Sequence, residues 1–200
     1  MLLSERFERA LTYATRKHAT QVRKGTDVPY VAHLLGVASI ALTYGADEDE
    51  AIAALLHDAI EDQGGAETRE EIRRLFGERV AGIVDACSDT DVEPKPPWEE
   101  RKKAYIAHLL EASPSARLVS AADKLDNARA ILADYRTLGE GLWSRFNGGR
   151  EGTLWYYRSL AETFRDFGLT PLVAELAEVV GEIERLAAGR ASACGALPNG

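Results

Sequence analysis

Leu55-Leu56-His57-Asp58-Ala59-Ile60-Glu61-Asp62 places four ionisable side chains within six positions at the end of an alanine- and leucine-rich run. The run is typical of an apolar helix. Burying ionisable groups is costly unless they bind a metal or pair with one another. The alternative is a helix C-terminus with solvated acids, which is disfavoured because the helix dipole prefers cations at that end. The stretch therefore favours a metal site.

The adjacent pair His57 and Asp58 imposes a geometric condition on such a site. Neighbouring residues of an α-helix point about 100° apart, so the two side chains can reach one ion only if it lies between their directions. An imidazole nitrogen with a carboxylate oxygen suits Mn, Fe or Zn better than Ca or Mg, which prefer oxygen ligands. Further ligands must come from elsewhere in the chain.

Two further residues are candidates for those ligands. His33 follows Pro29-Tyr30-Val31-Ala32 at the start of an apolar helix, where a histidine is more often an ordinary core residue. Asp123 follows the apolar run Val119–Ala122, and its alternative role is an ion pair with Lys124 or Arg129.

Helical periodicity runs through most of the chain, and alternating strand patterns, GxGxxG loops and Walker-type loops are missing. The pattern predicts an all-α protein, a single compact bundle of about eight to ten helices. We expect one domain over residues 1–188 and a flexible tail over 189–200, where Gly, Pro and small residues gather. The expected helices cover 7–14, 31–44, 48–60, 68–76, 78–88, 98–112, 115–138 (as one helix or two), 151–167 and 171–188.

Composition excludes several classes of protein. The chain has 200 residues, 46% hydrophobic and 28% charged, as expected of one soluble globular domain. A net charge of −8 argues against a nucleic-acid binder. No apolar run approaches the roughly 20 residues of a membrane span, and the N-terminus does not resemble a secretory signal, so we expect a cytoplasmic protein. The two cysteines form no zinc or disulfide framework.

The order His33, His57-Asp58, Asp123 resembles the H…HD…D pattern of the HD-superfamily metal-dependent phosphohydrolases. A narrower resemblance is to the hydrolase domain of RelA/SpoT-type alarmone enzymes. It rests on Ala14–His18, Gln21–Gly25 and Pro29-Tyr30, the HDxxED box at residues 57–62, the ADKL-x-N segment at 122–127, and Arg150–Tyr156. It covers roughly residues 5 to 170 and is limited to the hydrolase domain, as in small alarmone hydrolases.

This resemblance implies an HD-domain fold that hydrolyses guanosine 3′,5′-bis(diphosphate), (p)ppGpp, to GDP or GTP and pyrophosphate. It implies one divalent metal, Mn²⁺ in the first place, with Zn²⁺, Fe²⁺ or Co²⁺ as alternatives. The ligands would be His33, His57, Asp58 and Asp123. Glu61 and Asp62 would act on the attacking water. The implied substrate contacts are Arg23, Lys24, Lys124, Asn127, Arg150 and Tyr156, and we expect the basic residues among them, with Arg16 and Lys17, to line one cleft.

Other functions stay open at this point. An HD phosphohydrolase could act on another nucleotide, such as a nucleoside phosphate or the 2′-phosphate of NADPH. A non-catalytic nucleotide sensor is the alternative from a different class, and the Glu61-Asp62 pair counts against it. We expect a small-molecule nucleotide as partner, no nucleic acid and no membrane, with a homodimer as an option. The sequence assigns no role to His18 or to the loop Thr90–Trp98.

Overall fold

The computed structural model describes residues 2–88, 94–168 and 170–194. In these residues the chain forms ten α-helices and one 3-10 helix, and the only β-pairing is an isolated bridge between Val22 and Pro29. The all-α prediction is confirmed. The helices are α1 (Glu5–Lys17), α2 (Val31–Thr43), α3 (Glu48–Leu56), α4 (Ala59–Asp62), α5 (Gly65–Phe76), α6 (Glu78–Cys87), α7 (Trp98–Glu111), α8 (Pro114–Leu138), η1 (Gly139–Arg145), α9 (Gly149–Asp166) and α10 (Pro171–Cys194).

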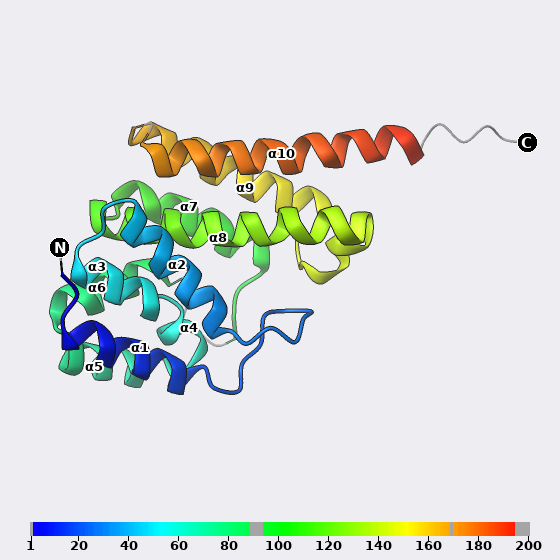
Figure 1. Ribbon diagram of the computed structural model, residues 1–200. Coiled ribbons are helices and arrows are strands. Elements are labelled where there is room, and N and C mark those ends of the chain that lie inside the picture. Colours follow the sequence, from blue (N-terminus) through cyan, green and yellow to red (C-terminus); the bar gives the residue numbers. More distant parts are fainter. Residues whose placement is uncertain (1, 89–93, 169, 195–200) are drawn as a thin grey trace, which may run out of the picture.

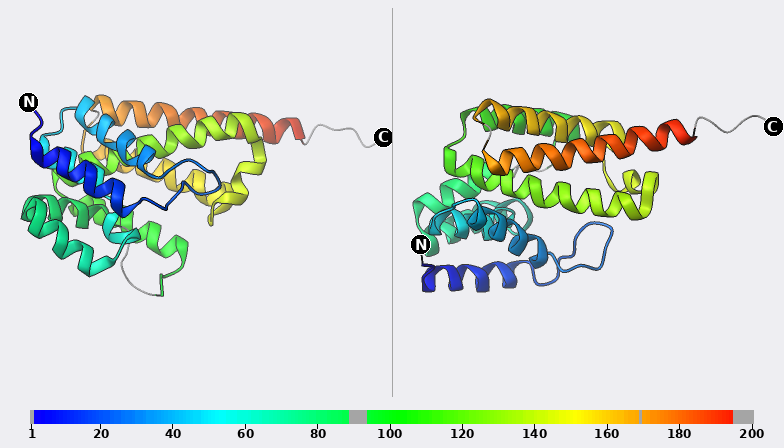
Figure 2. Two further views of the ribbon diagram at one scale, coloured as in Figure 1. Left: turned by 60° about the horizontal axis from the view of Figure 1, so that its bottom comes forward. Right: turned by 45° about the horizontal axis from the view of Figure 1, so that its top comes forward.

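The helices form two groups that meet at α2 and α8. Helices α1, α3, α5 and α6 lie on one side, and the long helices α8, α9 and α10 lie on the other with α7 (Figures 1 and 2). Helix α8 contacts members of both groups, because it packs against α2, α3 and α6 as well as α9, α10 and η1. Helix α2 packs against both α3 and α8. Helices α2 and α3, which are consecutive in the sequence, therefore both contact the distant helix α8.

Helix α3 lies in the interior, which explains its almost continuous apolar sequence. All six residues from Ala51 to Leu56 are buried, and Leu55 and Leu56 have no exposed surface. Burying each leucine side chain contributes about 1.5–3 kcal/mol. The N-terminus of α3 is fixed by a capping box, in which Asp47 accepts from the Glu50 amide and the Glu50 side chain accepts from the Asp47 amide. Burial of its side chains and the N-terminal capping box together therefore hold α3 in place.

The helix expected over residues 48–60 is interrupted, and that prediction is wrong in this detail. Helix α3 ends at Leu56, His57 and Asp58 form a turn, and the short helix α4 starts at Ala59. Asp58 has φ −97° and ψ −2°, away from the regular α-helix values of about −63° and −42°. Because of this turn, the two side chains are not held to the divergence of neighbours on a regular helix.

Other differences concern helix ends and connections. Residues 115–138 lie in one helix, α8, and a 3-10 helix, η1, follows it where no regular structure was expected. Helix α10 continues to Cys194, past the expected end at Ala188, so the division into a domain and a tail stays a prediction. The expected tail and the loop Thr90–Trp98 fall partly on residues 195–200 and 89–93, outside the described residues.

The capping box gives a test of how firmly α3 is held. Asp47→Ala should lower the free energy of unfolding by about 1 kcal/mol, because it removes the side-chain oxygen that accepts from the Glu50 amide. Asp47→Asn should lose much less, since asparagine caps equally well. Chemical denaturation measures both. An equal loss in the two variants would show that the ion pair of Asp47 with Arg79, 2.7 Å away, matters more than the cap.

Candidate metal centre and adjoining pocket

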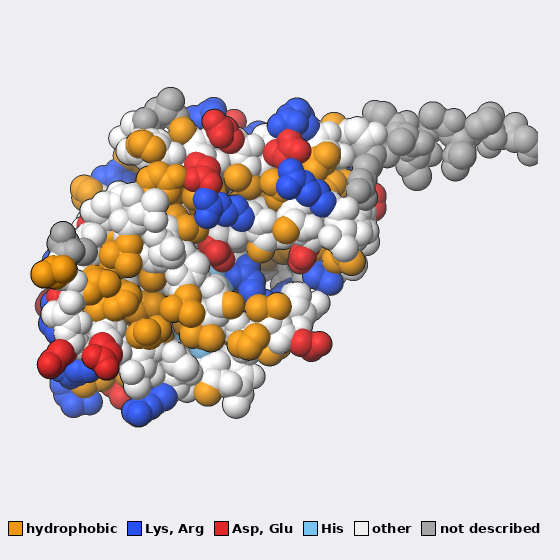
Figure 3. Space-filling model, in the orientation of Figure 1, with side chains coloured by type: hydrophobic (Ala, Val, Ile, Leu, Met, Phe, Trp, Pro, Cys, Tyr) orange, Lys and Arg blue, Asp and Glu red, His pale blue; other side chains and the backbone are white. Residues whose placement is uncertain are grey.

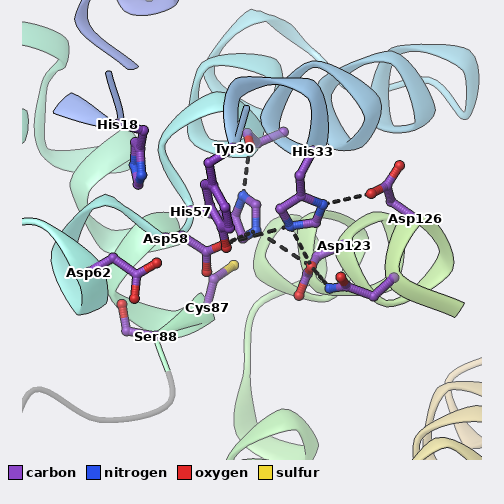
Figure 4. A network of polar contacts seen from close by, with 12 residues as sticks. His18, Tyr30, His33, His57, Asp58, Asp62, Cys87, Ser88, Asp123 and Asp126 are labelled. Atoms are coloured by element: carbon purple, nitrogen blue, oxygen red, sulfur yellow. Dashed lines mark hydrogen bonds and ion pairs between the residues drawn. The ribbon is translucent and has the colours of Figure 1, made fainter. Parts of the chain in front are cut away.

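Four ionisable side chains from α2, the α3–α4 turn and α8 meet in the interior (Figure 4). His33 lies in the first turn of α2, His57 and Asp58 form the turn after α3, and Asp123 lies near the middle of α8. His33, His57 and Asp123 are each at most 5% exposed. The mutual packing of the three elements thus brings together residues that are up to 90 positions apart.

The donor atoms of this cluster are spaced as ligands of one ion. Nε2 of His57 lies 3.0 Å from Oδ2 of Asp58 and 3.5 Å from Oδ1 of Asp123. Nε2 of His33 lies 3.6 Å and 3.3 Å from the same two oxygens. Two donors that bind one ion at about 2.0–2.2 Å are about 3.0–3.6 Å apart. Ligand atoms of His33, His57 and Asp58 lie within 4.8 Å of one another.

Hydrogen bonds on the outer side of each imidazole decide which ring nitrogen faces the cluster. Nδ1 of His33 lies 2.6 Å from Oδ2 of Asp126, and Nδ1 of His57 lies 2.9 Å from the carbonyl oxygen of Ala54. A carboxylate and a carbonyl can only accept, so each Nδ1 carries a proton and donates it. In the neutral rings both Nε2 atoms are therefore acceptors, and they face two carboxylate oxygens.

Four acceptors at this distance repel one another unless a cation lies between them. Nε2 of His57 is buried and makes no hydrogen bond. Burial lowers the pKa of His33, but hydrogen bonds to Asp123, Asp126 and Asp58 outweigh it and raise the pKa to about 9. Burial raises the pKa values of Asp58 and Asp123, but neighbouring charges outweigh it and hold both pKa values well below their usual range. The largest of these charges is His57 for Asp58, and Lys124 followed by His57 for Asp123. The residues fit a divalent metal ion, which would take the place of the protons.

Neighbouring side chains fix the two carboxylates. The Tyr30 hydroxyl donates to Oδ2 of Asp58 at 2.5 Å. Lys124 Nζ lies 2.6 Å from Oδ2 of Asp123, and the Asn127 amide donates to Oδ1 of Asp123 at 2.5 Å. Lys124 therefore serves Asp123, which was the alternative considered for Asp123; the same carboxylate nevertheless lies within the cluster. Metal ligands commonly have such hydrogen-bonded supports.

The predicted catalytic pair Glu61 and Asp62 lies on α4, directly after the turn. Asp62 accepts from the Gln21 amide at 2.8 Å, and its carboxylate lies beside Asp58 in Figure 4. Burial and the negative charge of Asp58 raise the pKa of Asp62, which suits a group that exchanges protons. Glu61 Oε1 lies 3.0 Å from Lys95 Nζ, in the described part of the proline-rich loop.

A pocket adjoins the cluster on the side of α8. It is visible in Figure 3 as a hollow between the 21–30 segment and α8, with basic side chains beside it. Asn127 connects the two sites, because its side chain donates to Asp123 and accepts from Arg23 at 2.9 Å. The pocket is lined by Arg23, Lys24, Thr26, Tyr30, Asn127, Ala130, Ile131, Asp134, Leu142, Arg145, Phe146 and Tyr157.

The structure brings Arg23, Lys24 and Asn127 to this pocket, whereas Arg150 and Tyr156 do not line it. Arg150 pairs with Glu140 and Glu151, and it donates to the carbonyl of Ala187 at 3.2 Å, so it connects η1, α9 and α10.

Tyr156 and two residues of the expected basic cleft, Arg16 and Lys17, have other surroundings. Tyr156 is 5% exposed and packs edge-on against Trp98. Arg16 and Lys17 on α1 lie outside the pocket, and Lys17 pairs with Glu71. Of the residues expected in one basic cleft, only Arg23 and Lys24 line this pocket. Its third basic residue, Arg145, was not singled out from the sequence.

Sequence reasoning missed several residues of the site. Asp126 and Gln21 stand inside the quoted motif strings, and Asp126 follows Asp123 by three positions, which places both on one side of a helix. That spacing was a usable signal. No pattern in the sequence pointed to Arg145 or Tyr157, because η1 and the rotation of α9 about its axis bring these residues to the pocket. His18 packs on the Tyr30 ring, with Nδ1 2.6 Å from Gln21 Oε1.

Comparison with known proteins agrees with this arrangement. The family model described as "HD domain" matches residues 10–154. The chain belongs to the HD domain family.

Relatives of this HD domain carry a specific name. "Guanosine-3′,5′-bis(diphosphate) 3′-pyrophosphohydrolase MESH1" of Drosophila melanogaster is 38% identical over 137 residues, 67% of this chain and 74% of that protein. The Xenopus tropicalis protein of the same name is 42% identical over 125 residues, 61% and 67% of the two chains. A solved structure titled "A metazoan ortholog of SpoT hydrolyzes ppGpp and plays a role in starvation responses" superposes with a TM-score of 0.72 and 29% identity, covering 90% of this chain and 96% of that one.

The metal centre makes a direct prediction. His57→Ala and Asp58→Ala should each lose the metal ion and nearly all hydrolysis, because each removes one of four protein ligands. Elemental analysis of the purified variants measures the metal content. His108→Ala, at an exposed position of α7, is the matched control and should keep the metal. Full occupancy with normal turnover in the His57 and Asp58 variants would remove the assignment of the centre.

Proposed function

We propose that this HD domain hydrolyses (p)ppGpp, with release of the 3′-pyrophosphate as PPi and formation of GDP or GTP. The observation that carries the proposal is the direct connection between the metal cluster and a basic pocket through Asn127. The names of the relatives support the same substrate. A nucleotide with two diphosphate groups needs both parts, one for the bond that breaks and one for the nucleoside.

The reaction breaks the bond between the ribose 3′-oxygen and the adjacent phosphorus of the diphosphate. A water oxygen forms the new bond to that phosphorus, the 3′-oxygen leaves with the bonding electron pair, and it gains a proton. When bound, a divalent cation supplies Lewis-acid chemistry, which offsets negative charge on phosphoryl oxygens and favours deprotonation of water at neutral pH. We propose that His33, His57, Asp58 and Asp123 hold it.

In this proposal, Asp62 and Glu61 orient the attacking water or accept its proton. The raised pKa of Asp62 brings the carboxylate nearer to the working pH, at which a general base is most effective. Gln21 holds this side chain through Oδ2. Lys95 pairs with Glu61, so this lysine of the proline-rich loop places a positive charge beside the Glu61 carboxylate.

Arg23, Lys24 and Asn127 contact the nucleotide in this proposal. The guanidinium of Arg23 is planar, so it can stack on a base or bind two phosphate oxygens at once. Lys24 Nζ lies 3.3 Å from Asn147 Oδ1, an exposed contact that a phosphate could replace.

Three further details belong to the proposal. Mn²⁺ is the proposed ion, because the family resemblance implies it, whereas imidazole nitrogens with carboxylate oxygens suit Mn, Fe and Zn alike. A homodimer and a cytoplasmic location stay predictions. Within the described part of the chain, none of the helices combines the length and the apolar character that crossing a bilayer requires.

The function is tested by a substrate panel. Purified protein with Mn²⁺ is incubated with ppGpp, common nucleotides and NADPH, and the products are separated by chromatography. Formation of GDP and pyrophosphate from ppGpp at the highest kcat/KM supports the proposal. Faster release of phosphate from NADPH or from another nucleotide would replace the substrate, and binding without turnover would make the protein a sensor.

Glu61→Gln tests the role of the acidic pair. It should keep the metal and bind substrate, while kcat falls by about 10²-fold or more, the scale for a lost acid or base group. Metal analysis and steady-state kinetics on the same preparation measure both. If the metal is lost with the carboxylate, Glu61 is a ligand and its assigned role is wrong.

Arg23→Ala tests the substrate class. KM for ppGpp should rise strongly, while hydrolysis of a small generic phosphoester changes little, because Arg23 is assigned to the nucleoside end of the substrate. Arg158→Ala is the matched control, since this exposed arginine of α9 pairs only with Glu184 among the described contacts. An equal loss on both substrates would make Arg23 a structural or catalytic residue.

A further inference from the structure

One carboxylate, that of Asp126, touches both the metal cluster and the pocket. Oδ2 of Asp126 lies 2.6 Å from Nδ1 of His33 and 3.2 Å from NH1 of Arg23. These two partners belong to different parts of the proposed site, since His33 is a metal ligand and Arg23 a nucleotide contact. The side chains of Asp126 and Arg23 are 22% and 21% exposed, so neither contact is a fully solvated surface pair.

Helix α2 has a space that fits this carboxylate. Gly36 lies one helical turn after His33, on the same side of α2. A Cβ atom at Gly36 would lie 2.3 Å from Oδ1 and 3.1 Å from Cγ of Asp126, which is closer than packed atoms approach. The glycine therefore admits Oδ1 against the backbone of α2, while Oδ2 points to His33 and Arg23.

We propose that Asp126 is a positioning residue that holds His33 and Arg23 in register through the single oxygen Oδ2. This inference rests on the proposed function, because it assigns the two partners to the metal and to the nucleotide. By accepting the hydrogen bond from Nδ1, Asp126 keeps the Nε2 lone pair of His33 directed into the cluster. By pairing with NH1, it leaves NH2 of Arg23 for Asn127, which in turn binds Asp123.

These contacts form a continuous chain from one proposed metal ligand to another. It runs from His33 through Asp126, Arg23 and Asn127 to Asp123. A change at Asp126 should therefore affect both metal affinity and substrate affinity. An aspartate that only paired with Arg23 for stability would leave the metal unaffected.

Calorimetric titration of Mn²⁺ into the metal-free protein tests the metal side without any turnover. Asp126→Ala should weaken Mn²⁺ binding by about 10- to 100-fold, as expected when the hydrogen-bond acceptor of a ligating histidine is lost. The KM for ppGpp should rise in the same variant at saturating Mn²⁺. Long-range ¹H–¹⁵N NMR spectra should show that His33 no longer holds its proton only on Nδ1.

Gly36→Ala is an independent variant that retains the Asp126 carboxylate and displaces it. It should weaken Mn²⁺ binding in the same direction as Asp126→Ala. Gly82→Ala, at an open exposed position of α6, and Asp85→Ala, which removes an ion pair with Arg69, are the matched controls and should bind Mn²⁺ like the unmodified protein. Thermal melts of all variants establish that they are folded.

The outcomes separate this inference from the function on which it rests. If the unmodified protein does not bind Mn²⁺, or does not cleave ppGpp, the proposed function fails. If it does both, and folded Asp126→Ala binds Mn²⁺ with unchanged affinity and an unchanged His33 signal, the positioning role of Asp126 is overturned.

Discussion

The buried meeting of two imidazole Nε2 atoms with two carboxylate oxygens is the constraint on which the rest of the structure depends. Because Ala54 and Asp126 accept hydrogen bonds from the two Nδ1 atoms, the Nε2 atoms of the neutral imidazoles are acceptors, and they lie 3.0–3.6 Å from the facing carboxylate oxygens of Asp58 and Asp123. Such a set is stable in an interior only with a cation among its members. The packing of α2, α3 and α8 therefore stabilises a charged centre, and the ion should in turn hold the three elements together.

The position of the pocket follows from the same helices. Residues three and four positions after Asp123 lie on the same side of α8, so Asp126 and Asn127 support the ligands on one side and contact Arg23 on the other. A nucleotide bound beside Arg23 thus lies next to the metal with no intervening element. Under the proposed function, the basic side chains and the metal would supply the local positive charge that an anionic nucleotide needs in a protein of net charge −8.

The sequence predicted the helices, and it named the four side chains that the structure brings together, because both depend on local patterns. Apolar periodicity located α2 and α8, and the misfit of His57 and Asp58 after an apolar run indicated a metal. It could not predict the turn at these two residues, since their dihedral angles depend on contacts such as that of Tyr30 with Asp58, 28 positions away. Arg150 and Tyr156 were chosen by motif, whereas the orientation of α9 brings Tyr157 to the pocket instead.

The central claim is that one divalent ion is bound by four named side chains. Anomalous diffraction at the manganese edge from crystals grown with Mn²⁺ tests it directly. The account predicts one strong peak within about 2.0–2.3 Å of His33 Nε2, His57 Nε2 and a carboxylate oxygen each of Asp58 and Asp123. A peak elsewhere, or full Mn²⁺ occupancy with any of these four side chains outside bonding distance, would contradict it.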